Sequence, residues 1–121
     1  MHTSLRDEFR RVWPLLKEAI IHDTHRKRHV WDAIDKGDCQ LWTAPNAAIV
    51  TELRVFPTGL KVINGWLAGG ELEGVKALVS QAEAWGKSQG CVKAGISCGR
   101  AGWSRKLDGY AVAGVQLTKE L

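Results

Sequence analysis

The chain changes from strand to helix within Gly65-Trp66-Leu67-Ala68-Gly69-Gly70-Glu71-Leu72-Glu73. Before this stretch the segments are short and rich in β-branched residues, which predicts strands. After it, apolar residues recur at three- and four-residue steps from Glu71 to Gln89, which predicts a long helix ended by Gly90. Cys91 to Ser97 then predicts a buried strand. A strand, a long crossover helix and another strand together indicate a parallel pair.

Three strands are predicted before the change and form an antiparallel meander. Their segments are Gln40 to Thr43, Ala48 to Val55 and Leu60 to Leu67, and Ala68-Gly69-Gly70 ends the last of them. After the long helix, Gly102 to Leu107 predicts a short helix and Ala111 to Leu117 a final strand.

Two helices are expected at the N-terminus. In the first, the apolar period runs from Leu5 to Ile20 with Ser4 as N-cap, and Pro14 should kink or restart it. The second should begin after the N-cap candidate Thr24 and stop at Gly37. The fold class is therefore α/β, with a mixed sheet, two N-terminal helices and a long crossover helix.

Length and composition indicate one domain, residues 1–121. The chain has a mass of 13.3 kDa, with 45% hydrophobic and 25% charged residues, which is typical of a globular domain. No apolar run approaches the length of a membrane span, and the first residues hold no secretory h-region. The odd count of 3 cysteines, without metal-ligand spacing, suits a reducing compartment. These features predict a cytoplasmic protein that does not bind membranes.

The net charge of +4 is concentrated in residues 87–121, which hold six basic and two acidic side chains. Such a segment could meet the phosphates of a cofactor or of nucleic acid, or could simply be solvated. The 6 tryptophans are expected mostly in the core or in pocket walls. Nucleic-acid binding is therefore kept only as a third, weaker hypothesis.

The element order and its glycines resemble the GCN5-related N-acetyltransferase (GNAT) superfamily from about Trp31 onward. More narrowly, Trp66 to Gly70, Gln89-Gly90-Cys91 and Gly99 to Tyr110 resemble small bacteriophage and prophage proteins described as GNAT-like. Gly109-Tyr110 stands where the superfamily often has Gly-Phe or Gly-Tyr after its last helix. The resemblance implies an acetyl-CoA site if the protein is an enzyme.

The resemblance places the cofactor-binding residues at the strand-to-helix change and in the later glycine-rich segment. In the superfamily, amides at the start of the long helix bind the pyrophosphate of coenzyme A, after a leading Gln or Arg. Here Leu67 replaces that residue, and Glu71 and Glu73 would repel the anion. The set that the resemblance implies is Leu67, Ala68, Gly69, Gly70, Arg100 and Trp103.

The segment around Arg100 has two interpretations. Arg100 and Arg105 could bind an anion or a partner's carboxylates. Alternatively, Gly99 and Gly102 form a tight turn, with Trp103 packed on the sheet and Arg100 bonded to backbone carbonyls.

No catalytic residue is assigned, although several were considered. A GNAT enzyme needs a base and an acid, the latter usually a Tyr on the short final helix. Glu52 could be the base or an ordinary solvent-facing strand residue. The final helix has Trp103 and no Tyr, and Tyr110 is expected to pack in the sheet. Cys98 could be a nucleophile or a small buried side chain.

A metal site is not expected. His22, His25 and His29 could share a helix face, but no Cys, Asp or Glu completes the set, and basic neighbours would oppose a cation.

Two functional hypotheses follow. The first is a noncatalytic phage or prophage protein, a structural or interaction component that resides in the host cytoplasm or the virion. Its partners would be other phage structural proteins or further copies of itself. The alternative is an acyl-CoA-dependent N-acetyltransferase acting on an unknown amine. Both require the two central strands to part where Ala68 to Gly70 pass into the helix that starts at Glu71.

Overall fold

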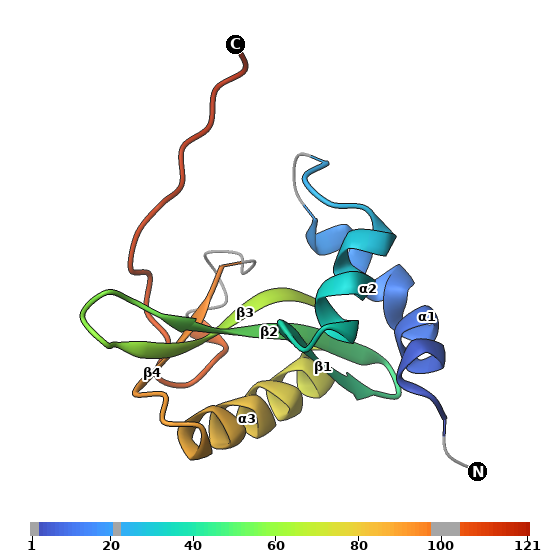
Figure 1. The fold of residues 1–121 in the computed structure, drawn as a ribbon, viewed down its shortest axis with the longest axis horizontal. Coiled ribbons are helices and arrows are strands. Elements are labelled where there is room, and N and C mark those ends of the chain that lie inside the picture. The colour runs from blue at the N-terminus through green and yellow to red at the C-terminus, as the bar shows by residue number, and fades with distance from the viewer. Residues whose placement is uncertain (1–2, 21–22, 98–104) are drawn as a thin grey trace.

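The structure is a four-stranded sheet with helices on both faces (Figure 1). It is a computed structural model that describes residues 3–20, 23–97 and 105–121. Helix α3 packs on one face of the sheet, and α1 and α2 pack on the other. The elements in chain order are α1 (Leu5–Leu16), the 3₁₀ turn η1 (Lys17–Ala19), α2 (Lys27–Asp35), β1 (Cys39–Ala44), β2 (Ala47–Val55), β3 (Lys61–Gly70), α3 (Leu72–Ser88) and β4 (Lys93–Ile96).

The sheet has the predicted mixed topology. The strand order is β1-β2-β3-β4. Strands β1, β2 and β3 pair antiparallel, and β3 pairs with β4 in parallel after the crossover through α3. The predicted meander and parallel pair are therefore confirmed, as is the mixed α/β fold class.

Helix α1 begins as predicted but passes through its proline. The Ser4 hydroxyl accepts a hydrogen bond from the Asp7 amide at 3.1 Å. Pro14 lies inside the helix, which ends at Leu16 and tightens into η1. Pro14 has no amide hydrogen to donate to the carbonyl of residue 10. Because residues 10 and 14 are both exposed, that carbonyl can accept a hydrogen bond from water instead.

The second helix starts later than predicted. Arg26, not Thr24, is the N-cap of α2, and its amide donates to Nδ1 of His29 at 2.9 Å. The Thr24 hydroxyl lies 2.8 Å from Nδ1 of His25 instead. The helix end agrees with the sequence, because Gly37 follows α2 with a φ of +83°.

Strand β3 is longer than predicted. Ala68 and Gly69 were expected to end the strand as a turn, yet they pair with Ile49 and Ala48 of β2. The small residues serve close packing, because a Cβ atom at Gly69 would lie 1.9 Å from the Leu15 carbonyl oxygen of α1. Close packing is thus a reason for Gly69 that the sequence pattern did not indicate.

Two buried clusters hold the layers together. The cluster between the sheet and α1/α2 is Phe9, Val12, Leu16, Val30, Ile34, Cys39, Ala48, Val50 and Leu67. The cluster between the sheet and α3 is Ala47, Ile49, Ile63, Val75, Leu78 and Ala82. Because alternate residues of β2 belong to opposite clusters, both faces of this strand are buried.

The C-terminal part differs most from expectation. The fourth strand, β4, was predicted to be buried, but it lies at the sheet edge with Lys93 and Ala94 exposed. The predicted final strand at 111–117 is wrong: residues 111–121 are exposed and pair with no strand of the described residues. The predicted short helix lies partly at 102–104, outside the described residues, and the described residues from 105 form no α-helix.

No helix in the described residues is long and apolar enough to cross a membrane.

Candidate functional site

In the described residues, β4 pairs with the first half of β3. The paired residues run from Val62 with Lys93 to Gly65 with Ile96. The Ser97 amide still donates to the Gly65 carbonyl at 2.9 Å. Strand β3 then continues to Gly70 with β2 as its neighbour, past a register shift opposite Val50 and Thr51. The expected parting at Ala68 to Gly70 stays a prediction, because residues 98–104, which follow β4, lie outside the described residues.

A polar cluster lies beside the last described pair of β3 and β4. The Asn64 side chain is 7% exposed, and its Nδ2 donates to Glu52 Oε1 at 3.2 Å and to Ser97 Oγ at 3.1 Å. Arg54 forms a salt bridge with the same Glu52 oxygen at 2.7 Å. One carboxylate oxygen of Glu52, the candidate base, is therefore already bound by a cation and an amide.

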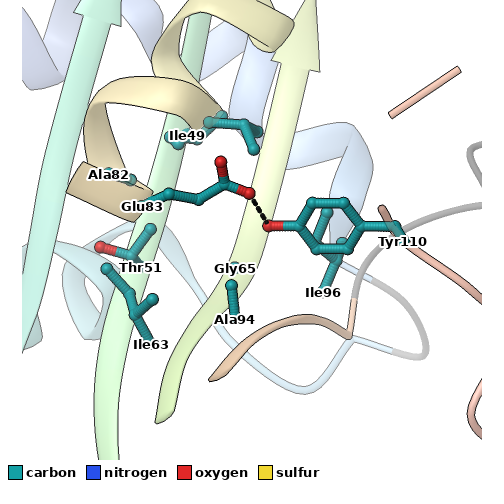
Figure 2. A pocket seen from close by; sticks show the side chains of 10 residues that line it. Ile49, Thr51, Ile63, Gly65, Ala82, Glu83, Ala94, Ile96 and Tyr110 are labelled. Atoms are coloured by element: carbon teal, nitrogen blue, oxygen red, sulfur yellow. Dashed lines mark hydrogen bonds between the residues drawn. The ribbon is translucent and has the colours of Figure 1, made fainter. Parts of the chain in front are cut away.

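A narrow slot lies on the other face of the sheet, beneath α3, and Tyr110 fills it (Figure 2). Its free volume is about 20 Å³, enough for a single water molecule. The slot is lined by Ile49, Thr51, Ile63, Gly65, Val79, Ala82, Glu83, Ala94, Ile96 and Tyr110. Tyr110 therefore packs against the sheet, as expected, and it joins β2, β3, β4 and α3.

The Tyr110 hydroxyl donates to Glu83 Oε2 at 2.7 Å (Figure 2). Burial raises the pKa of Tyr110 well above its ordinary value of 10.0, and the hydrogen bond to the Glu83 carboxylate and its charge raise it further. The phenol therefore stays protonated as a hydrogen-bond donor at neutral pH.

We expect Tyr110, the only tyrosine, to ionise only as the protein unfolds. The folded state keeps this proton above pH 10 while the unfolded state releases it, so unfolding becomes easier as pH rises past that value. Ultraviolet absorbance of phenolate, recorded with circular dichroism, should show the two transitions together. In denaturant the midpoint should return to about 10.

Glu83→Gln is the matched control for this titration, because it retains an acceptor and removes the charge. It should lower the pKa of Tyr110 relative to the unmodified chain. A phenolate midpoint near 10 in the folded protein would mean that Tyr110 lies in solvent and not in the slot.

Of the residues predicted at the cofactor turn, Leu67 is buried, Ala68 and Gly69 are half-buried, and Gly70 is exposed. The Leu67 side chain is 1% exposed in the core beneath α1, and Ala68 packs on the α3 side. A Cβ atom at Gly70 would lie 2.1 Å from the Asn46 carbonyl oxygen, and the φ of Gly70 is +106°. Close approach of backbone to backbone thus explains both Gly69 and Gly70 without a bound anion.

The start of α3 leaves three backbone amides free. The Glu71 amide donates to the Asn46 carbonyl at 2.8 Å, and helical bonding begins with Val75. The amides of Leu72, Glu73 and Gly74 have no acceptor in the described part of the chain. Such amides attract anions, but the exposed carboxylates of Glu71 and Glu73 stand beside them.

Gly69→Ala should reduce the free energy of unfolding by about 3 kcal/mol, because the methyl group would meet the backbone of α1. Gly114→Ala, where a Cβ meets nothing within 4 Å, is the matched control and should change it by less than about 0.5 kcal/mol. Urea denaturation without any ligand measures both. Equal stabilities would contradict the packing role of Gly69.

Several candidates lie outside the described residues: Arg100, Trp103, Cys98 and His22. Arg105 is described and exposed. Within the described residues, no group of three or more His, Cys, Asp or Glu side chains is placed to hold a metal ion. Burial raises the pKa of Cys39 to about 11, so this thiol stays protonated and unreactive at neutral pH.

Trp42 and Trp66 lie on opposite faces of the sheet. Trp42 packs on the α3 side, edge-to-face with Trp85 at 5.8 Å between ring centroids. Trp66 packs on the opposite side, where the His25 ring lies 4.8 Å from it.

Comparison with solved structures identifies the architecture. An acetyltransferase from Trypanosoma brucei superposes with a TM-score of 0.68 at 13% identity, over 99% of this chain and 97% of the other. Glucosamine-6-phosphate N-acetyltransferase from Arabidopsis thaliana superposes with a TM-score of 0.67 at 14% identity, over 98% of this chain and 95% of the other. This chain has the GNAT fold. At these identities the likeness shows the fold alone, and no protein-family model or curated protein sequence matches the chain.

Sequence reasoning missed two residues of the site. Glu83 lies four residues after Val79, on the apolar face of α3. A carboxylate on an apolar helix face indicates a hydrogen-bond donor nearby, which here is the Tyr110 hydroxyl. Asn64 interrupts an apolar strand in the same way, but its partners Glu52 and Ser97 are distant in sequence. Only the fold brings those side chains together.

Proposed function

We propose that the chain is a noncatalytic GNAT-fold protein that acts through protein–protein contacts. The observation that supports this proposal is Tyr110, whose side chain fills the slot at Gly65 and Ile96, the last described pair of β3 and β4. The resemblance to the superfamily implies a cofactor that extends from the start of α3 between these two strands. With about 20 Å³ free, the slot has no room for an acyl group.

The charges at the start of α3 also disfavour a coenzyme A pyrophosphate. Glu71 is exposed at the N-cap, and the Glu73 side chain is 85% exposed. The cation nearest in sequence, Lys76, already lies 3.7 Å from Glu73. An incoming pyrophosphate would therefore meet two carboxylates against one shared ammonium group. The described residues do not fit this cofactor, and we derive no transfer step from them.

The alternative, an acyl-CoA-dependent N-acetyltransferase, rests on a separate observation. The amides of Leu72, Glu73 and Gly74 are free at the start of a long helix, as an anion-binding helix requires. The structural neighbours are acetyltransferases of nearly the same length. In that case acetyl-CoA would supply the acyl group, and Tyr110 would have to leave the slot for it to be used.

The resemblance to small phage proteins extends the first proposal to a biological setting. The partner would then be another phage structural protein or a second copy, in the host cytoplasm or in the virion. Mass spectrometry of purified particles tests this extension, and absence of the chain from particles would contradict a virion location.

We expect isothermal calorimetry to detect no acetyl-CoA binding at cofactor concentrations up to about 1 mM, and no rise in melting temperature, because native-state ligands stabilise by mass action. The matched variant Glu71→Gln/Glu73→Gln removes both carboxylates and tests their repulsion. If this variant binds acetyl-CoA more tightly than the unmodified chain, the weak binding results from repulsion by the two carboxylates. Saturable micromolar binding by the unmodified chain, with acetyl transfer to any amine, would overturn the noncatalytic proposal.

A further inference from the structure

A row of three aromatic rings joins α1 to α2, which lie side by side on one face of the sheet (Figure 1). The Phe9 ring is buried, and the rings of Trp13 and Trp31 lie 5.6 Å and 5.5 Å from it, measured between ring centroids. Both tryptophans are only half-buried. The outer surface of the helix pair therefore presents parts of two indole rings to solvent, held in place by the core beneath them.

Exposed basic side chains flank both rings. Steps of four and seven residues place Arg10 and Lys17 on the same side of α1 and its continuation η1 as Arg6. The Arg6 guanidinium lies over the Trp31 ring, 5.7 Å from its centroid, and Lys27 precedes Trp31 by one turn of α2. We call this surface the basic aromatic face, and it comprises Arg6, Arg10, Trp13, Lys17, Lys27 and Trp31.

The positive charge of the basic aromatic face is not neutralised within the described residues. None of its four cations forms an ion pair there, whereas other basic side chains of the described chain do. Two carboxylates border the face, Asp7 three residues before Arg10 and Asp35 four residues after Trp31, and neither is paired with its cations. The face is therefore suited to a partner that brings its own negative charges.

The tryptophans indicate which anionic partner this is. Proteins bind single-stranded nucleic acid through cations that contact the phosphates and aromatic rings that stack on unpaired bases. Arg6 and Arg10 are separated by one helical turn, about 6 Å, which is similar to the separation of consecutive phosphates in an extended strand. A membrane surface would require projecting apolar side chains, and Leu5 is the only large apolar side chain of α1 and α2 that is exposed.

We infer that the basic aromatic face binds single-stranded nucleic acid without sequence specificity. The four cations contact successive phosphates, and unpaired bases stack on the exposed parts of Trp13 and Trp31. Because Phe9 fixes both rings and Arg6 already lies over one of them, little ordering is needed when the strand binds. This activity goes beyond the protein contacts proposed above and does not rest on them.

Fluorescence anisotropy of a labelled oligothymidylate of about 15 nucleotides, titrated with the full chain at about 50 mM salt, should show saturable binding. With four phosphate contacts, the slope of log K against log salt should be about −3, because each contact releases counterions. An abasic strand of the same length has the phosphates and no bases. It should bind about tenfold more weakly or worse, because it cannot stack on the tryptophans.

The variant Arg10→Gln/Lys17→Gln tests the site without disturbing the fold, because neither side chain forms a hydrogen bond or ion pair among the described residues. It should weaken binding by about tenfold and make the salt slope shallower by about 1.4. Lys87→Gln/Lys93→Gln is the matched control. It removes the same charge from exposed positions on α3 and β4, and should leave the affinity within about twofold.

Several results would overturn the inference. One is the absence of saturable binding at protein concentrations up to about 100 µM. Equal losses in the two variants would assign binding to net charge alone, and equal affinity for the abasic strand would leave the tryptophans without a role. Tighter binding to a duplex, to anionic lipid vesicles or to polyglutamate would identify a different partner. None of these measurements involves coenzyme A or a partner protein, so failure here is distinguishable from failure of the noncatalytic proposal.

Discussion

The early end of the β3–β4 ladder is the constraint on which the rest of the site depends. Parallel pairing stops at Gly65 and Ile96, while β3 continues along β2 to the start of α3. On one face of the sheet, Asn64 links β2 to Ser97, the residue after β4. On the other face, beneath α3, Tyr110 fills the slot beside Gly65 and Ile96, the last described pair of the ladder. The domain thus fills both faces of the end of this ladder with its own side chains.

Sequence reasoning recovered the elements that local chemistry specifies. Ser4 capped its helix as expected, and α3 ends at Ser88, two residues before Gly90, whose φ is +90°. It failed where contacts distant in sequence determine the structure. Arg26, not Thr24, is the N-cap of α2, and the residues before Glu71 pair with β2 as a strand instead of forming a turn. It also expected a strand from the alternation at 111–117, although a strand needs a neighbour, which a sequence pattern alone does not supply.

For the candidate site, the sequence located the junction of β3 and α3 but not the side-chain contacts beside it. Tyr110 was expected to pack, whereas its partner Glu83 could be paired with it only once α3 had been placed against the sheet. Glu52 was weighed as a base, and its ties to Arg54 and Asn64 depend on strand register. Motif spacing therefore indicates where a site could lie, and the side-chain contacts in the folded chain determine whether a ligand can enter it.

The two glycines at the end of β3 have an evolutionary consequence. Because α1 and the β1–β2 turn press directly on Gly69 and Gly70, larger residues there would be eliminated by selection for folding alone. A descendant that had abandoned acyl transfer would still inherit both. A glycine pair retained at this position in related proteins is therefore no sign of enzymatic activity. Replacement of Tyr110 and Glu83 by smaller residues would instead indicate that the slot is open.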